Sequence, residues 1–478
     1  MLQSHIIKII EEKFSRKPPL TPPYQGRGIH LKDGSGDLKL AQDDIKIVVI
    51  GTGIAASVFT RHILTLASKE NMNVKIIQIG HSSCNYCGGL MTNLASTTLK
   101  NLLNLDIPID VELSKINRCI FINSYGGFEV ALNAPLISML RTSKFGEQGF
   151  DDSLRKKILE GLDKEAHKYL SIIDPATVTK IEPLGSKRNK VYYTIKKADK
   201  EIDADVVVIA TGLRSLENTM MQKFSKDRGC IPPTMMDSCV TEIDTSKAIY
   251  DNLEHKTVII DGVIKDCVVG IVSKRKGWIT VTALNKVLTL EDLEHLFKHP
   301  SVKKYIDLPS VNKNLRCGII CEAKVFTAAA KNFYGDGWVI IGDLTGYGRI
   351  LKDGYFAALM GAYYAANTII HHGISKKAFE KHYHNKLKHF EFDNRIGMLL
   401  FDSNRRLKIL PLSSKLFLQA GIFEEKSGYA GFIHAGIRAI ITGELSYKII
   451  TSFFIFGWLK YLLTKSINFW RKGFNVEK

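Results

Sequence analysis

The chain has 478 residues, which exceeds the size of a single hydrophobic core and predicts two or three domains. Hydrophobic residues make up 45% of it and charged residues 24%, so the composition is that of a folded protein rather than a disordered one. The 66 Lys and Arg residues outnumber the 48 Asp and Glu residues, and the net charge of +18 favours an acidic lipid surface, a phosphorylated substrate or nucleic acid as partner. Eight cysteines in a chain of this length exclude a small disulfide-stapled fold.

The N-terminal segment 1–44 is expected to be a flexible leader. Apolar residues at helical spacing in 1–14 predict a short amphipathic helix, and the proline-rich segment 17–23 ends it because proline lacks an amide hydrogen. The segment lacks the apolar core and cleavage site of a signal peptide, and no part of the chain reaches the roughly 18–20 uncharged apolar residues of a membrane span. These features predict a cytoplasmic protein.

Organised structure is expected from residue 45, where a β-branched run, a helical segment and a second such run predict a βαβ unit. Two short strands around Gly126-Gly127 predict a hairpin. The remaining expected elements are strands at 191–195, 206–209 and 338–341, strand-like alternation over 256–284, and helices at 154–166, 291–299 and 355–371. The pattern predicts an α/β fold with a second, more antiparallel sheet, followed by a helical C-terminal region.

A glycine-rich turn joins the first strand to the first helix and predicts a dinucleotide site. Gly51 makes the tight turn, Gly53 lets the backbone approach a pyrophosphate, and Ala56 takes the third position, where close helix–strand packing is needed. The N-terminus of the helix then offers its amides to the phosphates. Gln78 stands at the end of the second strand, where an acid usually bonds the ribose, and its amide can still bond a hydroxyl.

Two later segments indicate which cofactor is bound. Residues 205–212 form a strand that ends in Ala-Thr-Gly, with Thr211 and Gly212 at its tip, and residues 337–343 form a strand that ends in Gly342-Asp343. Both resemble segments of flavoproteins that bind FAD, in which the aspartate bonds a ribityl hydroxyl. The helix that follows Gly354 would point its N-terminus at the pyrophosphate or the flavin.

With these segments the chain resembles the geranylgeranyl reductase family, within the larger group that contains aromatic hydroxylases and flavin-dependent halogenases. The resemblance covers residues 45–390. It includes the run Cys84-Asn85-Tyr86-Cys87-Gly88-Gly89-Leu90, which is similar to the Cys-Gly-Gly turn of the family beside the flavin ring. Arg141 resembles an arginine of the family that contacts FAD, although extra residues separate it here from the Phe-Asp that follows. Trp278 resembles part of the substrate sheet of the family.

The resemblance implies a Rossmann-type FAD-binding domain with an inserted antiparallel substrate-binding sheet. It implies an oxidoreductase that reduces carbon–carbon double bonds of an isoprenoid or other lipid; a flavin-dependent monooxygenase or desaturase is the alternative. Cys87 and Tyr86 are candidate proton donors beside the flavin, and either could be a packing residue instead. Electrons could come from NAD(P)H, from a ferredoxin acting as a redox partner protein, or from a quinone.

The expected division is a leader 1–44, an FAD domain 45–110, 140–230 and 325–375, a substrate domain 111–139 and 231–324, and a C-terminal region 376–478.

Other features of the sequence favour no further cofactor. The Cys84-x-x-Cys87 spacing matches neither a zinc ribbon nor the usual ferredoxin runs, so no metal site is expected. The absence of zinc-finger, helix-turn-helix and RNP motifs disfavours a nucleic-acid partner. Arg349 and Lys352 stand where the family has an uncharged loop, and they either offset the charge of a reduced flavin or lie in solvent.

The C-terminal stretch 449–470 is rich in aromatic residues and predicts an interfacial helix. Lys460 and Lys465 interrupt it, and a lysine at mid-bilayer costs about 2.5–3.5 kcal/mol. Residues 446–478 carry six Lys and Arg against one acid, so the tail is expected to rest on anionic lipid at the membrane surface. The alternative is a helix that packs on the catalytic domains or on a second copy.

Overall fold

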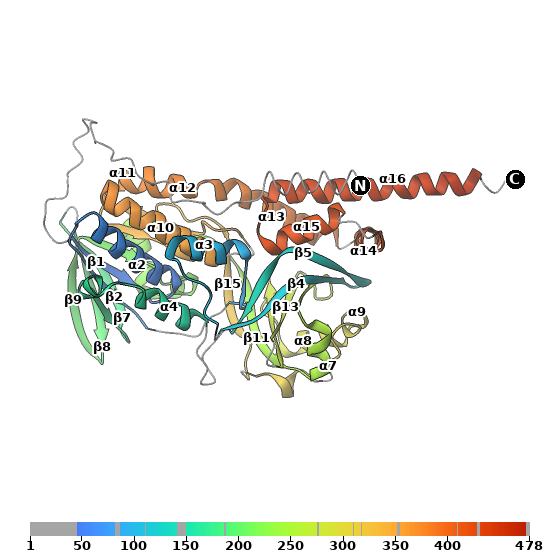
Figure 1. Ribbon diagram of the computed structural model, residues 1–478, viewed down its shortest axis with the longest axis horizontal. Coiled ribbons are helices and arrows are strands. Elements are labelled where there is room, and N and C mark those ends of the chain that lie inside the picture. The colour runs from blue at the N-terminus through green and yellow to red at the C-terminus, as the bar shows by residue number, and fades with distance from the viewer. Residues whose placement is uncertain are drawn as a thin grey trace.

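The structure is a computed structural model that describes residues 45–474, apart from 82–86, 110, 141–149, 186–187, 275–276, 309, 317, 351–353, 409 and 428–430. The expected leader 1–44 therefore lies outside the described residues. The elements form three neighbouring groups, which are a nucleotide-type α/β unit, a larger sheet beside it, and a layer of C-terminal helices over both (Figure 1).

The α/β unit is built on a mostly parallel sheet with the strand order β16-β17-β10-β1-β2-β6. Its central strands consist almost entirely of buried β-branched residues, as expected for a parallel sheet covered on both faces. Helices α2 and α10 pack on one face, and the small antiparallel sheet β7-β8-β9 covers the other (Figure 1). The strands are β1 (Ile45–Ile50), β2 (Val74–Ile79), β6 (Leu170–Ile173), β7 (Thr177–Leu184), β8 (Arg188–Ile195), β9 (Ala198–Ala204), β10 (Val206–Ile209), β16 (Tyr334–Gly335) and β17 (Trp338–Ile340). The helices are α2 (Ile54–Lys69), α3 (Asn93–Leu103), α4 (Phe150–Glu160), α5 (Lys164–Lys168), the 3-10 helix η1 (Leu213–Glu217), α6 (Thr219–Arg228), the 3-10 helix η3 (Gly342–Thr345) and α10 (Gly354–His372).

The second sheet has the order β15-β11-β14-β13-β12-β4-β5-β3 and is antiparallel except where β12 pairs with β4. Side chains alternate between its two faces, and those of one face form a hydrophobic core with the helices α7, α8 and α9. The strands are β3 (Leu90–Met91), β4 (Glu112–Asn123), β5 (Gly126–Met139), β11 (Thr234–Asp244), β12 (Lys256–Asp261), β13 (Val268–Lys274), β14 (Trp278–Leu284) and β15 (Cys321–Ala328). The helices are α7 (Lys247–Leu253), α8 (Leu290–Lys298), α9 (Pro300–Lys303) and the 3-10 turn η2 (Asn312–Asn314).

The hairpin between β4 and β5 differs in detail from the sequence prediction. The turn is formed by Ser124 and Tyr125, while Gly126 and Gly127 belong to β5. The side-chain oxygen of Asn123 accepts a hydrogen bond of 2.9 Å from the amide of Tyr125 and so closes the turn one step before the glycines. Gly126 takes a φ of +148°, which explains why a glycine follows the turn directly.

The C-terminal region is helical, as expected, and lies over the face of the second sheet opposite α7–α9 (Figure 1). Helices α15 and α16 approach closely because each has a glycine at the contact. A side-chain carbon on Gly436 would lie 2.7 Å from the ring of Phe454, and one on Gly457 would lie 2.7 Å from Ile433. The elements are α11 (Lys376–Ala378), the π-helix η4 (Phe379–His384), α12 (Asn385–Leu387), α13 (His389–Leu407), α14 (Pro411–Lys426), α15 (Phe432–Thr442) and α16 (Tyr447–Phe474).

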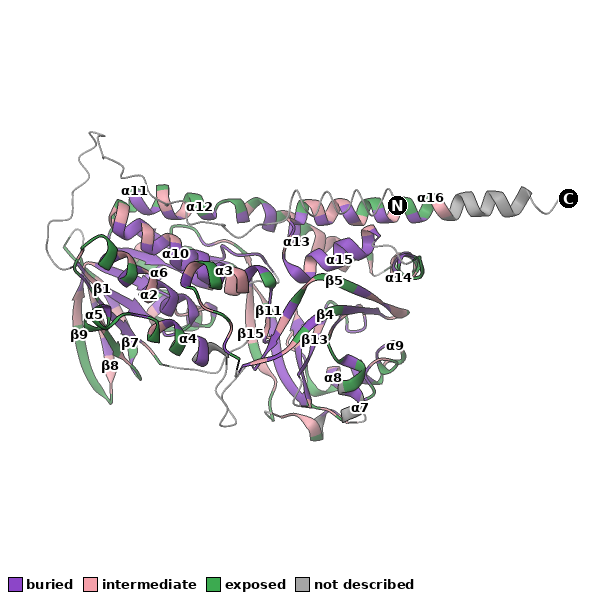
Figure 2. Cartoon of the chain, viewed as in Figure 1, coloured by how far each residue is buried: buried purple, intermediate pink, exposed green. Residues whose placement is uncertain are grey.

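Helix α16 has two apolar faces. Its first part packs on the protein through buried residues that include Ile450, Phe453 and Tyr461. A different face carries Ile455, Phe456, Leu459, Leu462 and Leu463, which are 43–63% exposed. Green, exposed stretches therefore alternate with purple and pink ones along this part of the helix in Figure 2. Within the described residues, none of the helices combines the length and the apolarity that a membrane span requires.

Candidate active site

The three groups of elements enclose one cavity of about 1270 Å³. Its lining comes from the carboxyl ends of β1, β2 and β10, the start of α10, one face of the second sheet, and the inner side of helices α13 to α16. Open parallel sheets bind ligands at the carboxyl ends of their strands, so the cavity lies where a dinucleotide is expected. Its volume exceeds the roughly 300–1000 Å³ of a site for one small ligand, and it has room for a cofactor and a substrate.

The glycine turn after β1 lies at one end of this cavity. Gly51 has a φ of +123°, and a side-chain carbon there would lie 2.4 Å from the carbonyl oxygen of Ala210, so this position requires glycine. Gly53 precedes α2 without a side-chain cap and meets nothing within 4 Å on the side where a side chain would project. Both glycines line the cavity, whereas Ala56 is buried behind them in the core of the α/β unit. The uncapped amides of α2 therefore face open space beside Gly53.

The other groups around the turn support its backbone. Gln78 is 1% exposed and does not line the cavity; its amide donates a hydrogen bond of 3.0 Å to the carbonyl of Gly51. Arg155 of α4 donates to the carbonyl of Thr52 at 3.0 Å. The residues that reach the cavity at the end of β2 are Gly80 and His81. Gly80 follows Ile79, the partner of Ile50 in the parallel register, so it stands opposite Gly51.

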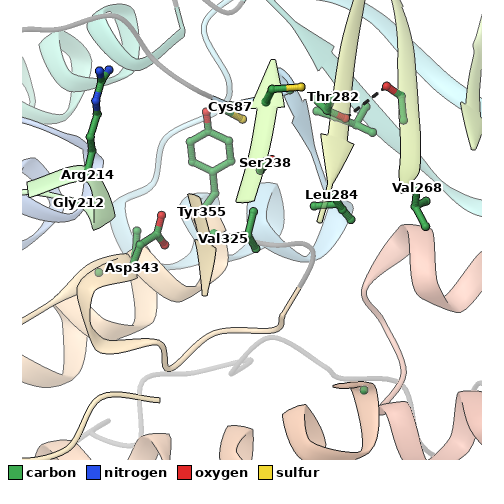
Figure 3. Close-up of a pocket in the computed structure, with 18 of the residues that line it drawn as sticks. Cys87, Gly212, Arg214, Ser238, Val268, Thr282, Leu284, Val325, Asp343 and Tyr355 are labelled. Carbon is green, nitrogen blue, oxygen red and sulfur yellow. Dashed lines mark hydrogen bonds between the residues drawn. The ribbon is translucent and has the colours of Figure 1, made fainter. Parts of the chain in front are cut away.

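The segment after β10 lines the cavity next to the glycine turn. Thr211 and Ser215 share a hydrogen bond of 2.7 Å between their hydroxyls, and Gly212 has a φ of +73°. Arg214, close to Gly212 in Figure 3, also lines the cavity and is exposed, so a positively charged side chain borders the cavity here. The sequence analysis missed Arg214 because nothing in its spacing distinguishes it from a surface arginine.

Gly342, Asp343 and Gly354 come together at the start of α10, and all three line the cavity. A side-chain carbon on Gly354 would lie 3.4 Å from a carboxylate oxygen of Asp343. Because glycine has no such carbon, the carboxylate has room beside the N-terminus of α10. Burial raises the pKa of Asp343 to about 6. Its carboxyl group thus changes its charge close to neutral pH.

The Cys-Gly-Gly turn lies where the α/β unit meets the second sheet. Cys87 and Gly88 line the cavity, and Gly89 lies one step behind them with its amide 3.3 Å from the Cys87 sulfur. Lys274, at the end of β13, is 0% exposed and donates hydrogen bonds of 2.9 Å to the carbonyls of Gly89 and Met139. A longer contact of 3.4 Å reaches the carbonyl of Gly88. Lys274 therefore connects the second sheet to this turn, and the sequence analysis missed it because a lysine near a loop is usually solvated.

Four further residues named in the sequence analysis lie elsewhere. Tyr86, Arg141 and Lys352 are outside the described residues. Trp278 is buried and does not line the cavity; the guanidinium of Arg316 lies 3.8 Å from the centre of its ring.

Arg349 was expected either to offset the charge of a reduced flavin or to lie in solvent. It does neither, because it does not line the cavity and is only 1% exposed. Its guanidinium donates to the carbonyls of Leu445 and Ala439, the latter in the last turn of α15, and stacks 4.4 Å from the ring of Tyr447. The side chain of Asn394 makes two hydrogen bonds to the same loop. It donates to the carbonyl of Gly348 at 2.7 Å and accepts from the amide of Ile350 at 3.1 Å. The loop before α10 is therefore fastened to the C-terminal helices.

The remaining lining is largely apolar and comes from two sides. Alternate residues of the second sheet form one wall, including Ile259, Val268, Val272, Leu284 and Val325. Val268, Leu284 and Val325 are labelled in Figure 3. The facing wall consists of residues from the C-terminal helices, namely Leu400, Phe401, Ile437, Ile440, Ile441, Phe454 and Trp458. The helices that the sequence analysis treated as a separate region thus complete the cavity.

No group of three or more His, Cys, Asp or Glu side chains among the described residues is arranged to hold a metal ion. His372, the last residue of α10, and His382 of η4 stack with their ring centroids 3.4 Å apart. Burial and the neighbouring charges of His382 and His371 lower the pKa of His372 to about 4.

No protein-family model matches this sequence, and a search of curated proteins finds no match. Solved structures resemble it in fold. A geranylgeranyl bacteriochlorophyll reductase-like protein from Thermoplasma acidophilum has a TM-score of 0.60 at 11% identity, over 88% of this chain and 99% of that one. A flavoprotein/dehydrogenase from Cytophaga hutchinsonii has a TM-score of 0.57 at 14% identity, over 84% and 93% of the two chains. A flavin-dependent brominase has a TM-score of 0.55 at 15% identity, over 90% and 100%.

At these identities the likeness shows the fold. The sequence prediction of a Rossmann-type α/β domain with an inserted antiparallel sheet and a helical C-terminal region is confirmed.

Proposed function

We propose that the protein is an FAD-dependent oxidoreductase that reduces carbon–carbon double bonds of an isoprenoid or another lipid-like substrate. The observation that carries this proposal is the continuity of the cavity. The glycine turn and Asp343 line one part of it, and the apolar faces of the second sheet and the C-terminal helices line the rest. A cofactor in the first part would adjoin an apolar molecule in the second.

The residues present fit FAD. The open space at Gly53 and the uncapped N-terminus of α2 suit the pyrophosphate, and Arg214 would add a positive charge there. Asp343 would accept a hydrogen bond from a hydroxyl of the ribityl chain, and Gly88 would let the Cys87–Gly88 turn lie against the ring. Bound FAD, once reduced by NAD(P)H, a ferredoxin or a quinol, supplies a hydride to one alkene carbon while a proton goes to the other.

The chain itself would hold the alkene and exclude water. The two apolar walls surround the substrate, and a dry site strengthens the electrostatic interactions within it. Cys87 lines the cavity where the two parts meet, so its thiol is a candidate source of the proton, together with Tyr86. Lys274 acts as a positioning residue, because it bonds the carbonyls of the turn that carries Cys87.

A direct experiment tests the cofactor and the reaction together. The purified protein is expected to show the two near-ultraviolet and visible absorption bands of bound oxidised flavin, or to acquire them after FAD is added and the excess removed. Under anaerobic conditions with dithionite, a polyprenyl alcohol is expected to gain pairs of hydrogen atoms, detected by mass spectrometry. A protein that binds no flavin would refute the proposal.

A flavin-dependent monooxygenase or desaturase is the second candidate, because a brominase has the same fold and fold does not determine the reaction. The fate of the reduced enzyme separates the two. Insertion of an oxygen atom into an apolar substrate after rapid reoxidation by dioxygen would favour a monooxygenase. Slow reoxidation together with alkene reduction would favour the reductase.

We further propose that α16 lies on an anionic membrane surface. Its exposed apolar residues Ile455, Phe456 and Leu459 share one face with Leu462 and Leu463, at the spacing of an amphipathic helix. Lys448 and Lys460 belong to the same helix, and the lysine excess of 446–478 suits acidic lipid headgroups. A helix there would bring the cavity close to a source of apolar substrate.

Flotation with liposomes tests this surface. The full chain is expected to float with vesicles that contain phosphatidylserine and to float less with neutral vesicles. The variant Phe456→Ser/Leu459→Ser/Leu463→Ser removes the exposed face without touching the buried one, and it should float poorly. The matched variant Leu399→Ser/Leu412→Ser changes exposed leucines of α13 and α14 and should float normally. Equal flotation of all three proteins would contradict the proposal.

A further inference from the structure

The cavity ends in a polar cluster far from the glycine turn. Asp261 is the last residue of β12, and Asn404 and Lys408 come from α13 and the residue after it. All three line the cavity. The cluster stands out because it holds a pair of opposite charges whose residues belong to two different groups of elements. Asn123, which neighbours Asp261 in the parallel register, and Ser414, whose carbonyl accepts from Asn123, also line the cavity and make this end polar.

The geometry of the cluster is compact. The Lys408 ammonium lies 2.7 Å from one carboxylate oxygen of Asp261, and the Asn404 amide donates to the other oxygen at 2.7 Å. The side chains of Asp261 and Lys408 are only 10% and 11% exposed. A contact of 3.5 Å from Lys408 to the carbonyl of Cys267 completes the arrangement. An ion pair is thus held in a largely enclosed site and carries no net charge.

The register of the sheet gives the distance of this cluster from the Cys-Gly-Gly turn. Asp261 pairs with Val268, the first residue of β13, and Lys274, the last residue of that strand, bonds the carbonyl of Gly89. Six residue-to-residue steps along β13 lead from Val268 to Lys274, which corresponds to roughly 20 Å. The cluster and the turn therefore stand at opposite ends of the cavity-facing wall.

The surface between the two ends suits an extended apolar chain. Along β13 the cavity-facing positions are Val268, Gly270 and Val272, and Thr282 of β14 lies beside Gly270 with its hydroxyl 3.3 Å from the carbonyl of that glycine. A side-chain carbon on Gly270 would lie 2.9 Å from the hydroxyl oxygen of Thr282, so the glycine leaves room for the threonine at the centre of the wall. A linear molecule could lie along this strand with one end at Cys87 and the other at Asp261.

We propose that Asp261, Lys408 and Asn404 form a head-group site for the hydroxyl of a long apolar alcohol. A hydroxyl can donate to the Asp261 carboxylate and accept from the Lys408 ammonium at the same time, which leaves the pair intact. A phosphate would face the carboxylate and an amine would face the ammonium, so either charged head would disturb the pair at a cost in free energy. The inference rests on the proposed function, since it takes this cavity to be the substrate site.

An ion pair that served only to hold α13 on the sheet would have a different signature. Replacement of a buried pair by apolar residues of similar size is often neutral for stability, because each charge costs free energy to remove from water. A purely structural pair would therefore be dispensable without any change in ligand preference. A head-group site would lose its preference for a hydroxyl.

The test uses the full-length protein loaded with FAD and four probes that share one alkyl chain. Dodecanol, 1-methoxydodecane, dodecyl phosphate and dodecylamine are titrated by calorimetry below their micelle-forming concentrations. Dodecanol should bind at least about tenfold more tightly than the methyl ether, which lacks the donor, because one hydrogen bond to a charged group has this effect. It should also bind more tightly than either charged probe. Tighter binding of the phosphate or the amine, or no binding of any probe, would overturn the inference.

Variants separate the head-group site from general packing. In Asp261→Leu/Lys408→Met the alcohol and the ether should bind equally, while Asp266→Asn/Lys415→Met, which changes exposed charges near the cluster, should keep the preference. Asn404→Leu retains the ion pair and should reduce the preference a few-fold, so it replaces the double variant if that protein does not fold. An unchanged preference in these cluster variants would refute the site.

The absorption spectrum of each sample distinguishes this failure from a failure of the proposed function. Bound FAD without a preference for the alcohol refutes only the head-group site, whereas wild-type protein that binds no flavin refutes the proposed function.

Discussion

The two parts of the cavity are built by different means. Around the glycine turn, backbone atoms form the surface, and the residues there are small because larger ones would not fit. Gly51 has the carbonyl of Ala210 against it, and Gly354 has the carboxylate of Asp343 beside it. In the other part, side chains from the second sheet and from four helices meet across the cavity. A backbone site depends on a few residues at fixed spacing, whereas a side-chain site depends on how distant elements pack.

The largest expected effect is on the backbone part. Gly51→Ala would force a side chain into the carbonyl of Ala210 at a φ of +123°, and it should destabilise the protein by about 2–4 kcal/mol and abolish FAD binding. Thermal unfolding and the flavin spectrum measure the two effects.

Gly185→Ala is the control for this change. Gly185 also has a positive φ, of +68°, but it lies in the β7–β8 turn with nothing within 4 Å of an added carbon. It should show only a modest loss of stability and normal FAD content. Equal loss of FAD in both variants would contradict the assignment of Gly51 to the cofactor site.

The junction of the two parts should respond next. Lys274→Met removes the donor to the carbonyls of Gly89 and Met139. The carbonyl of Gly89 keeps its hydrogen bond of 2.8 Å from the amide of Met139, so the loss falls mainly on the carbonyl of Met139, and the free energy of unfolding should fall by about 1–3 kcal/mol. The Cys87–Gly88 turn should also become mobile, which faster amide hydrogen exchange at Gly88 and Gly89 would reveal. Lys324→Met, at a partly exposed ion pair on β15, should change stability by less than about 1 kcal/mol. Unchanged exchange in the first variant would show that Lys274 does not position the turn.

The side-chain part should be separable from cofactor binding. Gly436→Leu places a side chain against the ring of Phe454 and should push α15 from α16, at a cost of about 1–3 kcal/mol. Binding of an apolar probe such as dodecanol should weaken while FAD content stays normal. Ser452→Leu, on the exposed surface of α16, provides the comparison. If FAD is lost as readily as the probe, the two parts of the cavity are not independent.

The smallest expected effect is a pH dependence. Because the pKa of Asp343 is raised from 3.8 to about 6, the carboxylate that would accept a hydroxyl of FAD is lost as the pH falls below 6. The affinity for FAD should therefore fall by about tenfold for each pH unit well below 6, and Asp343→Asn should remove this dependence. For the protein without FAD the sign is opposite. Burial favours the protonated acid, so this group's contribution to stability is fully present below pH 3.8 and is lost as the pH rises through 6. FAD titrations and thermal unfolding between about pH 3.5 and 8 measure both.

Much of the α/β unit was predictable from the sequence because its signals are local. A buried strand of β-branched residues ending at Gly51 leads directly into α2, and the strands before Gly212 and Gly342 follow the same pattern. The predicted helix at 355–371 appears as Gly354–His372. By contrast, β7, β9 and β11 carry mixed polar residues, and only their pairing partners identify them as strands.

The sequence by itself determined the class of fold, the glycine turn and the basic, aromatic C-terminal segment, since each depends on neighbouring residues or on composition. The tertiary structure decided which distant residues share a site. It buried Arg349 against α15, directed Gln78 to the carbonyl of Gly51, and brought Lys408 to Asp261 across 147 positions of sequence. It also gave α16 one buried and one exposed apolar face. Such contacts depend on the packing of whole elements, and no pattern in a single segment records that packing.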